Sequence, residues 1–307
     1  MPSTNPTKNT GPRPPAGRSR SARPPAGRSR SARARAAEAA ERRRRNQYIV
    51  AAVASTVVVL LIAVLVVVKV TSSGSTNSGT PANAAAPPSV IAQLAAIPPS
   101  TLAQAAASTK VTNGPKPITA PPLTEGSKPL VFYYGAEYCP YCAAERWPMV
   151  TALLQFGQFT GLAATHSAAN DVNPNTATFS FSGSSYSSQY VAFNGVETQT
   201  NTGAPLDTPT AAQQQIVQTY DNVPYVSSSA VGTIPFIDFG GKYLQSGASY
   251  DGTLLQGKDM AQISAAVADP TSKIGQQVLA SAGLITEDIC QLTGNQPAAV
   301  CSAFPGH

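Results

Sequence analysis

Two cysteines separated by two residues, Cys139-Pro140-Tyr141-Cys142, are the part of this 307-residue chain best suited to chemistry. The reactive form of a cysteine is its thiolate, and the free N–H groups and dipole of a helix N-terminus lower the pKa of a thiol. Pro140 suits the first position of such a helix, where its missing N–H leaves nothing unpaired. We therefore expect Cys139 to be the more exposed, attacking thiol and Cys142, within one turn, to resolve a mixed disulfide.

Two other interpretations of this cysteine pair stay open on the sequence alone. The first is half of a zinc site, which would need a second ligand pair at suitable spacing. The remaining cysteines, Cys290 and Cys301, have ten residues between them, and the two histidines are not placed to help. The second is an inert structural disulfide. The residues favour a redox pair, with no metal and no cofactor.

The segment Thr233-Ile234-Pro235 is the second candidate element. A proline that opens a strand is unremarkable by itself. Downstream of a C-x-x-C motif it predicts a cis Ile234–Pro235 bond, which would place the proline against the cysteine pair and expose the backbone of Ile234 to an extended substrate. The candidate substrate-binding residues are therefore Thr233, Ile234, Pro235, Pro140 and Tyr141.

The elements around these motifs predict an α/β fold with a mixed sheet. The run 130–134 (LVFYY) indicates a buried strand, and a helix should extend from the cysteine motif to about 157 through Pro148. The other expected elements are a strand at 162–167, irregular strands over 176–193, a helix from Thr208-Pro209 to about 220, a hairpin over 234–244, and short helices at 90–97, 100–107, 258–268, 272–281 and 286–292.

These pieces resemble the thioredoxin superfamily, and the Pro-Tyr dipeptide is similar to that of glutaredoxins. More closely, the chain from about residue 87 resembles the membrane-anchored thioredoxin-like proteins of the family "domain of unknown function 929". Four segments carry the resemblance: KPLVFYYGAEYCPYCAAERW (128–147), FSFSGSSYSSQYVAF (179–193), GTIPFIDFGGKY (232–243) and ICQLTGNQPAAVC (289–301). The resemblance implies a thioredoxin-like mixed sheet and a redox role, but no substrate.

The chain departs from the thioredoxin pattern in two ways. Residues 143–234 separate the cysteine motif from the proline, which implies a helical or irregular insertion, as in periplasmic thiol oxidases of the Dsb type. Thioredoxins also carry a buried carboxylate in the strand before the motif, and LVFYY has none. Glu137 is the nearest acid, and we expect it at the rim of the site. The proton acceptor for Cys142 is therefore not identified.

The other cysteines, a histidine and the tryptophan are interpreted mainly as structural residues. Cys290 and Cys301 predict a structural disulfide, whose loop closure is worth roughly 3 kcal/mol in the chain-entropy model. The alternative is a shuttle pair that relays electrons to Cys139 and Cys142. His166 is expected on the surface or in a loop, and Trp147 in the core or in the wall of the site.

The N-terminal part has a different composition from the rest. Of the 21 Lys and Arg residues, 14 lie in residues 1–69 beside two acids, so this part carries +12 and residues 70–307 carry −6. A nucleic-acid binder would spread its positive charge over a folded face. Residues 1–46, with a tandem RPPAGRSRSA repeat, predict a disordered cytoplasmic tail. Its Arg42–Arg45 run would fix the topology or, alternatively, bind anionic lipid headgroups.

An uncharged apolar run, Tyr48–Val68, is long enough to span a bilayer. A cleaved signal peptide is the alternative, but its apolar core would be shorter and followed by a small-residue cleavage site. The boundaries expected are a transmembrane helix at 47–69, a flexible linker at 70–86 and a folded domain at 87–307. The arginines before the run place the N-terminus in the cytoplasm and the domain outside.

The expected function is that of a single-pass, membrane-anchored thiol–disulfide oxidoreductase acting on protein thiols and disulfides. Oxidation or isomerisation of secreted proteins is favoured over reduction, which would need electrons from a membrane partner. The alternative from another class is a non-catalytic surface-binding module with a structural disulfide. The partners expected are protein substrates, a membrane redox protein and the lipid bilayer, but no nucleic acid.

Overall fold

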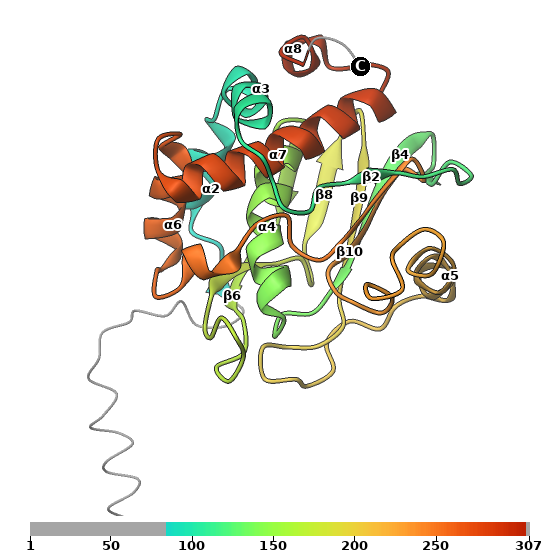
Figure 1. Ribbon diagram of the computed structural model, residues 1–307, viewed down its shortest axis with the longest axis horizontal. Helices are drawn as coiled ribbons and strands as arrows, with labels where there is room; N and C mark the ends of the chain where they lie inside the picture. The colour runs from blue at the N-terminus through green and yellow to red at the C-terminus, as the bar shows by residue number, and fades with distance from the viewer. Residues whose placement is uncertain (1–83, 305–307) are drawn as a thin grey trace, which may run out of the picture. The chain divides into compact units, whose positions relative to one another are not determined.

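The computed structural model describes residues 84–304, which are built around a mixed β-sheet (Figure 1). The central strand is β4 (Lys128–Gly135), with β10 (Phe236–Phe239) antiparallel on one side and β9 (Ala192–Glu197) parallel on the other. The sheet is completed by β11 (Tyr243–Ser246), β2 (Lys116–Pro117) and β3 (Thr124–Glu125), in the order β2-β11-β10-β4-β3 with β9 on β4. The predicted α/β class with a mixed sheet is confirmed.

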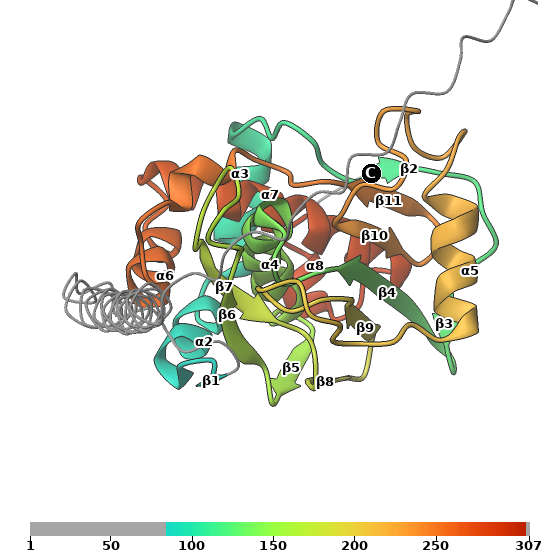
Figure 2. The ribbon, with the colours of Figure 1, turned by 90° about the horizontal axis from the view of Figure 1, so that it is seen from below.

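Strand alternation divides the hydrophobic core between the two faces of this sheet, because successive side chains point to opposite sides. Val131 and Tyr133 belong to a large cluster shared with α4 (Pro140–Leu153) and α7 (Lys273–Leu292). Leu130 and Phe132 belong to a smaller cluster, against which α5 (Ala211–Tyr220) packs. Figure 2 shows the same division, with α5 beside β4 and β10 and away from α2 and α6.

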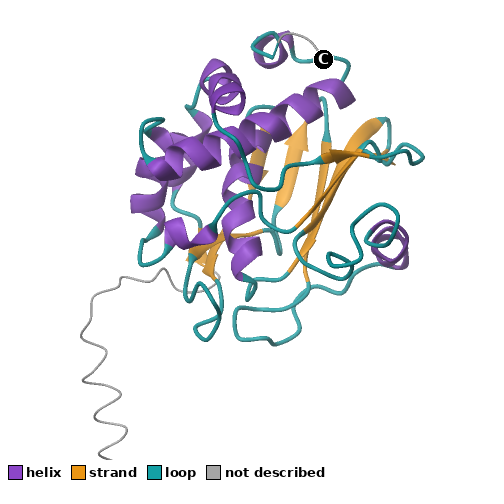
Figure 3. Ribbon diagram, viewed as in Figure 1, coloured by secondary structure: helices purple, strands orange, loops and turns teal. Residues whose placement is uncertain are grey.

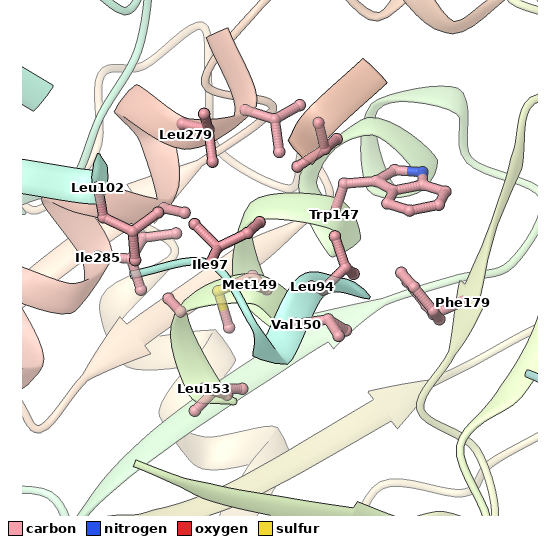
Figure 4. Packing of buried hydrophobic residues seen from close by; sticks show 14 of the residues in the cluster. Leu94, Ile97, Leu102, Trp147, Met149, Val150, Leu153, Phe179, Leu279 and Ile285 are labelled. Atoms are coloured by element: carbon pink, nitrogen blue, oxygen red, sulfur yellow. The ribbon is translucent and has the colours of Figure 1, made fainter. Parts of the chain in front are cut away.

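Several of the helices that contribute to the larger cluster lie together on one side of the sheet in Figure 3. They are α4, α7, α2 (Pro88–Ala95), α3 (Pro99–Ser108) and α6 (Met260–Ala268). Trp147 of α4 is fully buried, donates from Nε1 to the carbonyl oxygen of Ala177 at 3.1 Å, and meets the Phe179 ring edge-on at 4.8 Å (Figure 4). Trp147 is therefore a core residue.

Helix α4 continues through Pro148 because a side chain from another element replaces the lost hydrogen bond. A proline has no N–H to donate to the carbonyl four residues earlier, which here is that of Ala144. The hydroxyl of Tyr250 donates to this carbonyl oxygen at 2.9 Å. The helix that carries the cysteine motif is thus continuous from Pro140 to Leu153.

The insertion between the cysteine motif and Pro235 contributes a different strand to the central sheet from the one that was expected. The expected strand at 162–167 is β6 (Ala163–His166), but it pairs with β1 (Ala84–Ala85) and β7 (Ala177–Ser180) in a separate sheet. A third sheet pairs β5 (Gly157–Thr160) with β8 (Ser185–Ser188). The parallel neighbour of β4 is β9, of which only Ala192 and Phe193 fall within the run 176–193 that was predicted to form irregular strands.

Two helix boundaries were also predicted wrongly. Helix α5 is capped by Thr210, whose hydroxyl and the Gln213 side chain form a reciprocal capping box, so Thr208-Pro209 precedes it. The expected helices at 272–281 and 286–292 are one helix, α7, which passes through Gly283. A side chain at Gly283 would collide with the carbonyl oxygen of Leu102. Gly283 therefore permits close packing of α7 on α3 and does not end a helix.

The C-terminal and N-terminal ends of the described chain complete the fold. A short 3-10 turn, η1 (Gly252–Leu255), precedes α6, and α8 (Ala298–Cys301) follows α7. At the other end, β1 already pairs with β6 and Ala86 is buried, so the expected linker at 70–86 extends three residues too far. The expected tail at 1–46 and transmembrane helix at 47–69 lie outside the described residues.

Membrane-spanning capacity within residues 84–304 is limited to one bent pair of helices. No single helix there combines the length and the apolar character that a span requires. Helices α2 and α3 meet the requirement only when taken together, and they are bent by 72° at the break between them.

Candidate active site

The cysteine motif lies where the sequence places it, at the N-terminus of α4 after the central strand. Cys139 is the N-cap residue, and its Sγ accepts the backbone N–H of Cys142 at 3.2 Å. Pro140 occupies the first turn. Both cysteines are free thiols, 3% and 0% exposed respectively, so the expected greater exposure of Cys139 is a small difference.

The Ile234–Pro235 segment faces Cys139, and its peptide bond is cis, as predicted. The Cys139 thiol donates to the Ile234 carbonyl oxygen at 3.5 Å. The Thr233 hydroxyl stabilises this loop by two hydrogen bonds. It donates to the Ala230 carbonyl oxygen at 2.8 Å and lies 2.6 Å from the Ser246 hydroxyl. Two segments that are far apart in the sequence thus meet at the Cys139 sulfur.

The candidate substrate-binding residues lie around the Cys139 sulfur and differ in their exposure to solvent. Tyr141 is 51% exposed, Thr233 is exposed and Ile234 is half-buried. Pro140 and Pro235 are buried beneath them. The structure therefore brings all five residues to one place, with the two prolines as support and the other three accessible from outside.

The two thiols are electrostatically unequal. The hydrogen bond from the Cys142 thiol, together with the backbone N–H groups of Cys142 and Tyr141, lowers the pKa of Cys139 against the opposing effect of burial. Burial raises the pKa of Cys142 well above the usual thiol range, and the hydrogen bond to Cys139 raises it further. Cys139 is thus the thiol that ionises first.

A buried ion pair that the sequence did not reveal lies behind the cysteines. Arg146, one turn after Cys142 on α4, donates from Nε to Glu197 Oε1 at 2.7 Å and from Nη2 to Glu197 Oε2 at 2.6 Å. Nη2 also donates to the carbonyl oxygen of Ala136 at 2.7 Å. Both charged side chains are fully buried. The pair ties α4 to the ends of β4 and β9, beside the loop that carries Cys139.

Tyr133 of β4 adds a buried hydroxyl to this cluster. Arg146 Cζ lies 5.8 Å from the centre of the Tyr133 ring. The hydroxyl extends over Gly135, where a Cβ atom would lie 2.5 Å from Oη. Burial raises the pKa of Tyr133 well above its usual value, with opposing effects from Arg146 and Cys142. Gly135 thus leaves the space that the tyrosine hydroxyl occupies.

The expectation for Glu137 was wrong, because this residue is fully buried and not at the rim. Its backbone N–H donates to the Gln199 carbonyl oxygen at 2.9 Å, which continues the β4–β9 pairing and turns the side chain inward. Glu137 Oε2 accepts the Asn201 N–H at 3.2 Å. His166 ends β6, is half-buried, and lies 3.0 Å through Nε2 from the Asn201 side chain.

Glu145, also missed by the sequence reasoning, is buried on α4 next to Arg146. Its Oε2 accepts the backbone N–H and the hydroxyl of Ser249, both at 2.7 Å. Burial raises its pKa to about 7. The sequence did contain a sign that Glu145 and Arg146 are buried. They are an acid and a base in the otherwise apolar run CAAERWPMV, on a helix that must be buried to hold the motif.

Cys290 and Cys301 form the predicted disulfide, with a Cα–Cα distance of 5.5 Å. Cys290 lies in the last turn of α7 and Cys301 at the end of α8. Because these two cysteines are joined to each other, they do not supply the second ligand pair that a zinc site at Cys139 and Cys142 would require.

The fold and site define a mixed α/β protein with a C-x-x-C pair at a helix N-terminus. The chain belongs to the family described as Domain of unknown function (DUF929), whose model matches residues 117–291. The matched range includes the cysteine motif, the Arg146–Glu197 pair and Pro235, and it ends between Cys290 and Cys301. No curated protein and no solved structure matches the chain.

Proposed function

We propose that this chain is a thiol–disulfide oxidoreductase that acts on protein thiols and disulfides through Cys139 and Cys142. The observation that carries the proposal is the placement of Cys139 Sγ, which accepts the Cys142 N–H at the start of α4 and faces the Ile234 carbonyl. The opposite shifts in the pKa values of the two thiols give them different roles. Cys139 is the nucleophile, and Cys142 is the resolving thiol.

A thioredoxin-like architecture for residues 87–307 is part of this proposal. Its support is the order strand, C-x-x-C, helix, insertion, cis-proline, hairpin and helix, with β4 between a parallel and an antiparallel neighbour. The insertion supplies β9, α5 and the strands of the two smaller sheets except β1, which precedes the cysteine motif.

The proposed reaction runs in two exchange steps. The Cys139 thiolate attacks one sulfur of a substrate disulfide, a mixed disulfide forms, and the other substrate sulfur leaves as a thiolate. The Cys142 thiolate then attacks Cys139 Sγ and releases the second substrate thiolate, so that the substrate is reduced and Cys139–Cys142 is oxidised. The same steps in reverse transfer a disulfide to a substrate dithiol.

Oxidation or isomerisation is the direction that we favour. Lowering the pKa of Cys139 stabilises the reduced, thiolate form of the site, and a stabilised reduced form makes a dithiol pair more oxidising. Reduction is the alternative direction. In either direction a membrane redox protein would restore the starting state of Cys139 and Cys142.

We also propose that the apolar run Tyr48–Val68 anchors the domain outside the membrane, with residues 1–46 in the cytoplasm. The support is the charge asymmetry around the run, with Arg42–Arg45 before it and Lys69 after it. A membrane-impermeant thiol reagent applied to intact, reduced cells should label Cys139. If labelling requires lysis, Cys139 lies on the cytoplasmic side and the proposed orientation is wrong.

Exchange with a protein disulfide tests the enzymatic proposal against the alternative of a non-catalytic binding module. The full-length chain should catalyse reactivation of a scrambled secreted test protein, and Cys139→Ser should abolish the activity. A binding module would show equal, background rates with both proteins. Cys290→Ser with Cys301→Ser is the matched control, because it removes two cysteines outside the site.

A further inference from the structure

The proposed reaction requires a fully buried thiol to ionise, because Cys142 must become a thiolate before it can attack Cys139. Burial strongly disfavours that charge and holds the pKa of Cys142 well above the usual thiol range. Strand β4 carries no carboxylate that could take the proton. Glu197 is already occupied by two hydrogen bonds from Arg146, and the buried Glu137 accepts the Asn201 N–H through Oε2.

Arg146 has one donor group left over. Residues four apart on a helix are neighbours on the same face, so Arg146 lies next to Cys142 on α4. Nε and Nη2 bind Glu197 and Ala136, whereas Nη1 is buried and has no hydrogen-bond partner within residues 84–304. Buried donors are nearly always paired, so this one calls for an explanation. Its positive charge acts on Cys142 and lowers the pKa of that thiol.

Tyr133 presents a second spare group in the same cluster. Its hydroxyl is buried, extends over Gly135, and has no partner in the described part of the chain. Burial is the main cause that raises its pKa; Arg146 lowers it, and the negative charges of Cys142, Glu197 and Cys139 raise it, so Tyr133 lies within electrostatic reach of both cysteines. A tyrosine at this position is therefore a neutral O–H donor.

We propose that the spare N–H of Arg146 and the hydroxyl of Tyr133 form a preorganised site that stabilises the thiolate of Cys142, with Glu197 holding the guanidinium in position. This inference rests on the proposed function. Before reaction, the negative Glu197 neutralises Arg146, so the buried cluster carries no net charge. Preorganised donors of this kind need no rearrangement when the negative charge develops.

The atoms of the resolving step balance without a carboxylate that stores the proton. The Cys142 thiolate forms a bond to Cys139 Sγ, the bond from Cys139 to the substrate sulfur breaks, and the substrate sulfur leaves with the electron pair. The leaving thiolate takes up a proton, through water, that matches the one released by Cys142. The site therefore has to stabilise a transient negative charge, which donors can do.

A coloured aryl disulfide separates the two steps, because it releases one chromophoric thiolate on attack by Cys139 and a second on resolution by Cys142. In the reduced full-length chain, Tyr133→Phe should slow the second release by roughly threefold to tenfold and change the first much less. Tyr186→Phe is the matched control, since its hydroxyl binds the Leu153 carbonyl oxygen away from the site. It should alter neither release.

The double variant Arg146→Met with Glu197→Gln removes the charges without leaving one of them unpaired. Its second release should slow by tenfold or more, and the pH at which that release reaches half its maximum should move upward. Besides Arg146 and Glu197, the titratable groups that interact with Cys142 are Cys139, Tyr133 and Tyr138. If the double variant does not fold, Tyr133→Phe decides the question alone.

The outcomes distinguish this inference from the proposed function. An unchanged second release and pH profile in folded Tyr133→Phe protein would overturn the thiolate site and leave the exchange reaction in place. A merely structural cluster would lower the melting temperature of the variants without changing the ratio of the two releases. Failure of the unaltered chain to release either thiolate would overturn the proposed function itself.

Discussion

The chain holds two cysteine pairs at opposite kinds of helix end. Cys139 and Cys142 begin α4, where N–H groups and the positive end of the helix dipole favour a thiolate. Cys290 lies in the last turn of α7, where the negative end of the dipole disfavours one. The first pair is free in the structure, and the second is joined in a disulfide.

The two cysteine pairs also differ in what surrounds them: one lies beside buried charges and the other in apolar packing. Behind Cys142 lies the Arg146–Glu197 ion pair, which is costly to bury and contributes little to stability compared with apolar packing. Cys290 and Cys301 instead extend the large hydrophobic cluster. Position on a helix and buried charge therefore distinguish the free pair, Cys139 and Cys142, from the disulfide-bonded pair, Cys290 and Cys301.

The largest expected effect comes from breaking the ion pair behind the reactive cysteines. Arg146→Met alone leaves Glu197 buried and uncompensated, and should lower the free energy of unfolding by about 3–5 kcal/mol. Denaturant unfolding of the variant measures the loss. The double variant with Glu197→Gln is the control and should recover most of the stability. Equal losses in the single and double variants would show that packing, not charge, is responsible.

Removal of the structural disulfide should have the next largest effect. Cys290→Ser with Cys301→Ser opens a loop with a sequence separation of 11, and should lower the free energy of unfolding by about 3 kcal/mol in the chain-entropy model. Thermal unfolding measures this loss, while turnover of a model disulfide by the folded variant should stay nearly unchanged. Loss of turnover in folded protein would instead assign this pair to electron relay.

The titration of Glu145 should have a smaller effect on stability. Glu145 is a buried acid on α4, like the cysteine motif, but its hydrogen bonds are to Ser249. Its pKa is raised from 4.5 to about 7 in the folded chain, so the unfolded chain loses this proton first as the pH rises. Stability should therefore fall between about pH 4.5 and 7 because of this group, by up to roughly 3 kcal/mol. The amide of Glu145→Gln can still accept from Ser249, and this variant should be more stable at pH 8.

The exposed Glu125→Gln, on β3, is the matched control for the Glu145 variant and should leave the pH dependence of stability unchanged. Denaturant unfolding at pH 5 and pH 8 measures both variants. If Glu145→Gln instead loses stability at pH 8, the hydrogen bonds from Ser249 to the ionised carboxylate outweigh the cost of burying its charge.

The features predicted correctly are those specified by local sequence. The apolar run of β4, the cysteine motif at a helix start and the proline before β10 each depend on neighbouring residues, so their types and spacing could be interpreted directly. The disulfide between Cys290 and Cys301 also needed only proximity in sequence and an even cysteine count. The cis bond at Pro235 was inferred from two motifs taken together.

The features that were missed depend on contacts between distant segments. Glu197 lies 51 residues from Arg146, and the pairing follows from β9 joining β4, whereas residues 194–197 lie beyond the run 176–193 for which strands were predicted. Two helices, 272–281 and 286–292, were expected where α7 is continuous, and the role of Gly283 between them depends on its close approach to Leu102 of α3. Glu137 was placed at the rim because the continued pairing with Gln199 has no local signal.

Trapping of mixed disulfides by the two single-cysteine variants tests the central claim most directly. The full-length Cys142→Ser chain retains the nucleophile and lacks the resolving thiol, so it should accumulate disulfide-linked complexes with protein substrates in the same membrane preparation in which Cys139→Ser accumulates few or none. Non-reducing electrophoresis, with and without a reductant, measures both. Equal trapping by the two variants, or trapping only through Cys142, would contradict the assignment of Cys139 as the attacking thiol.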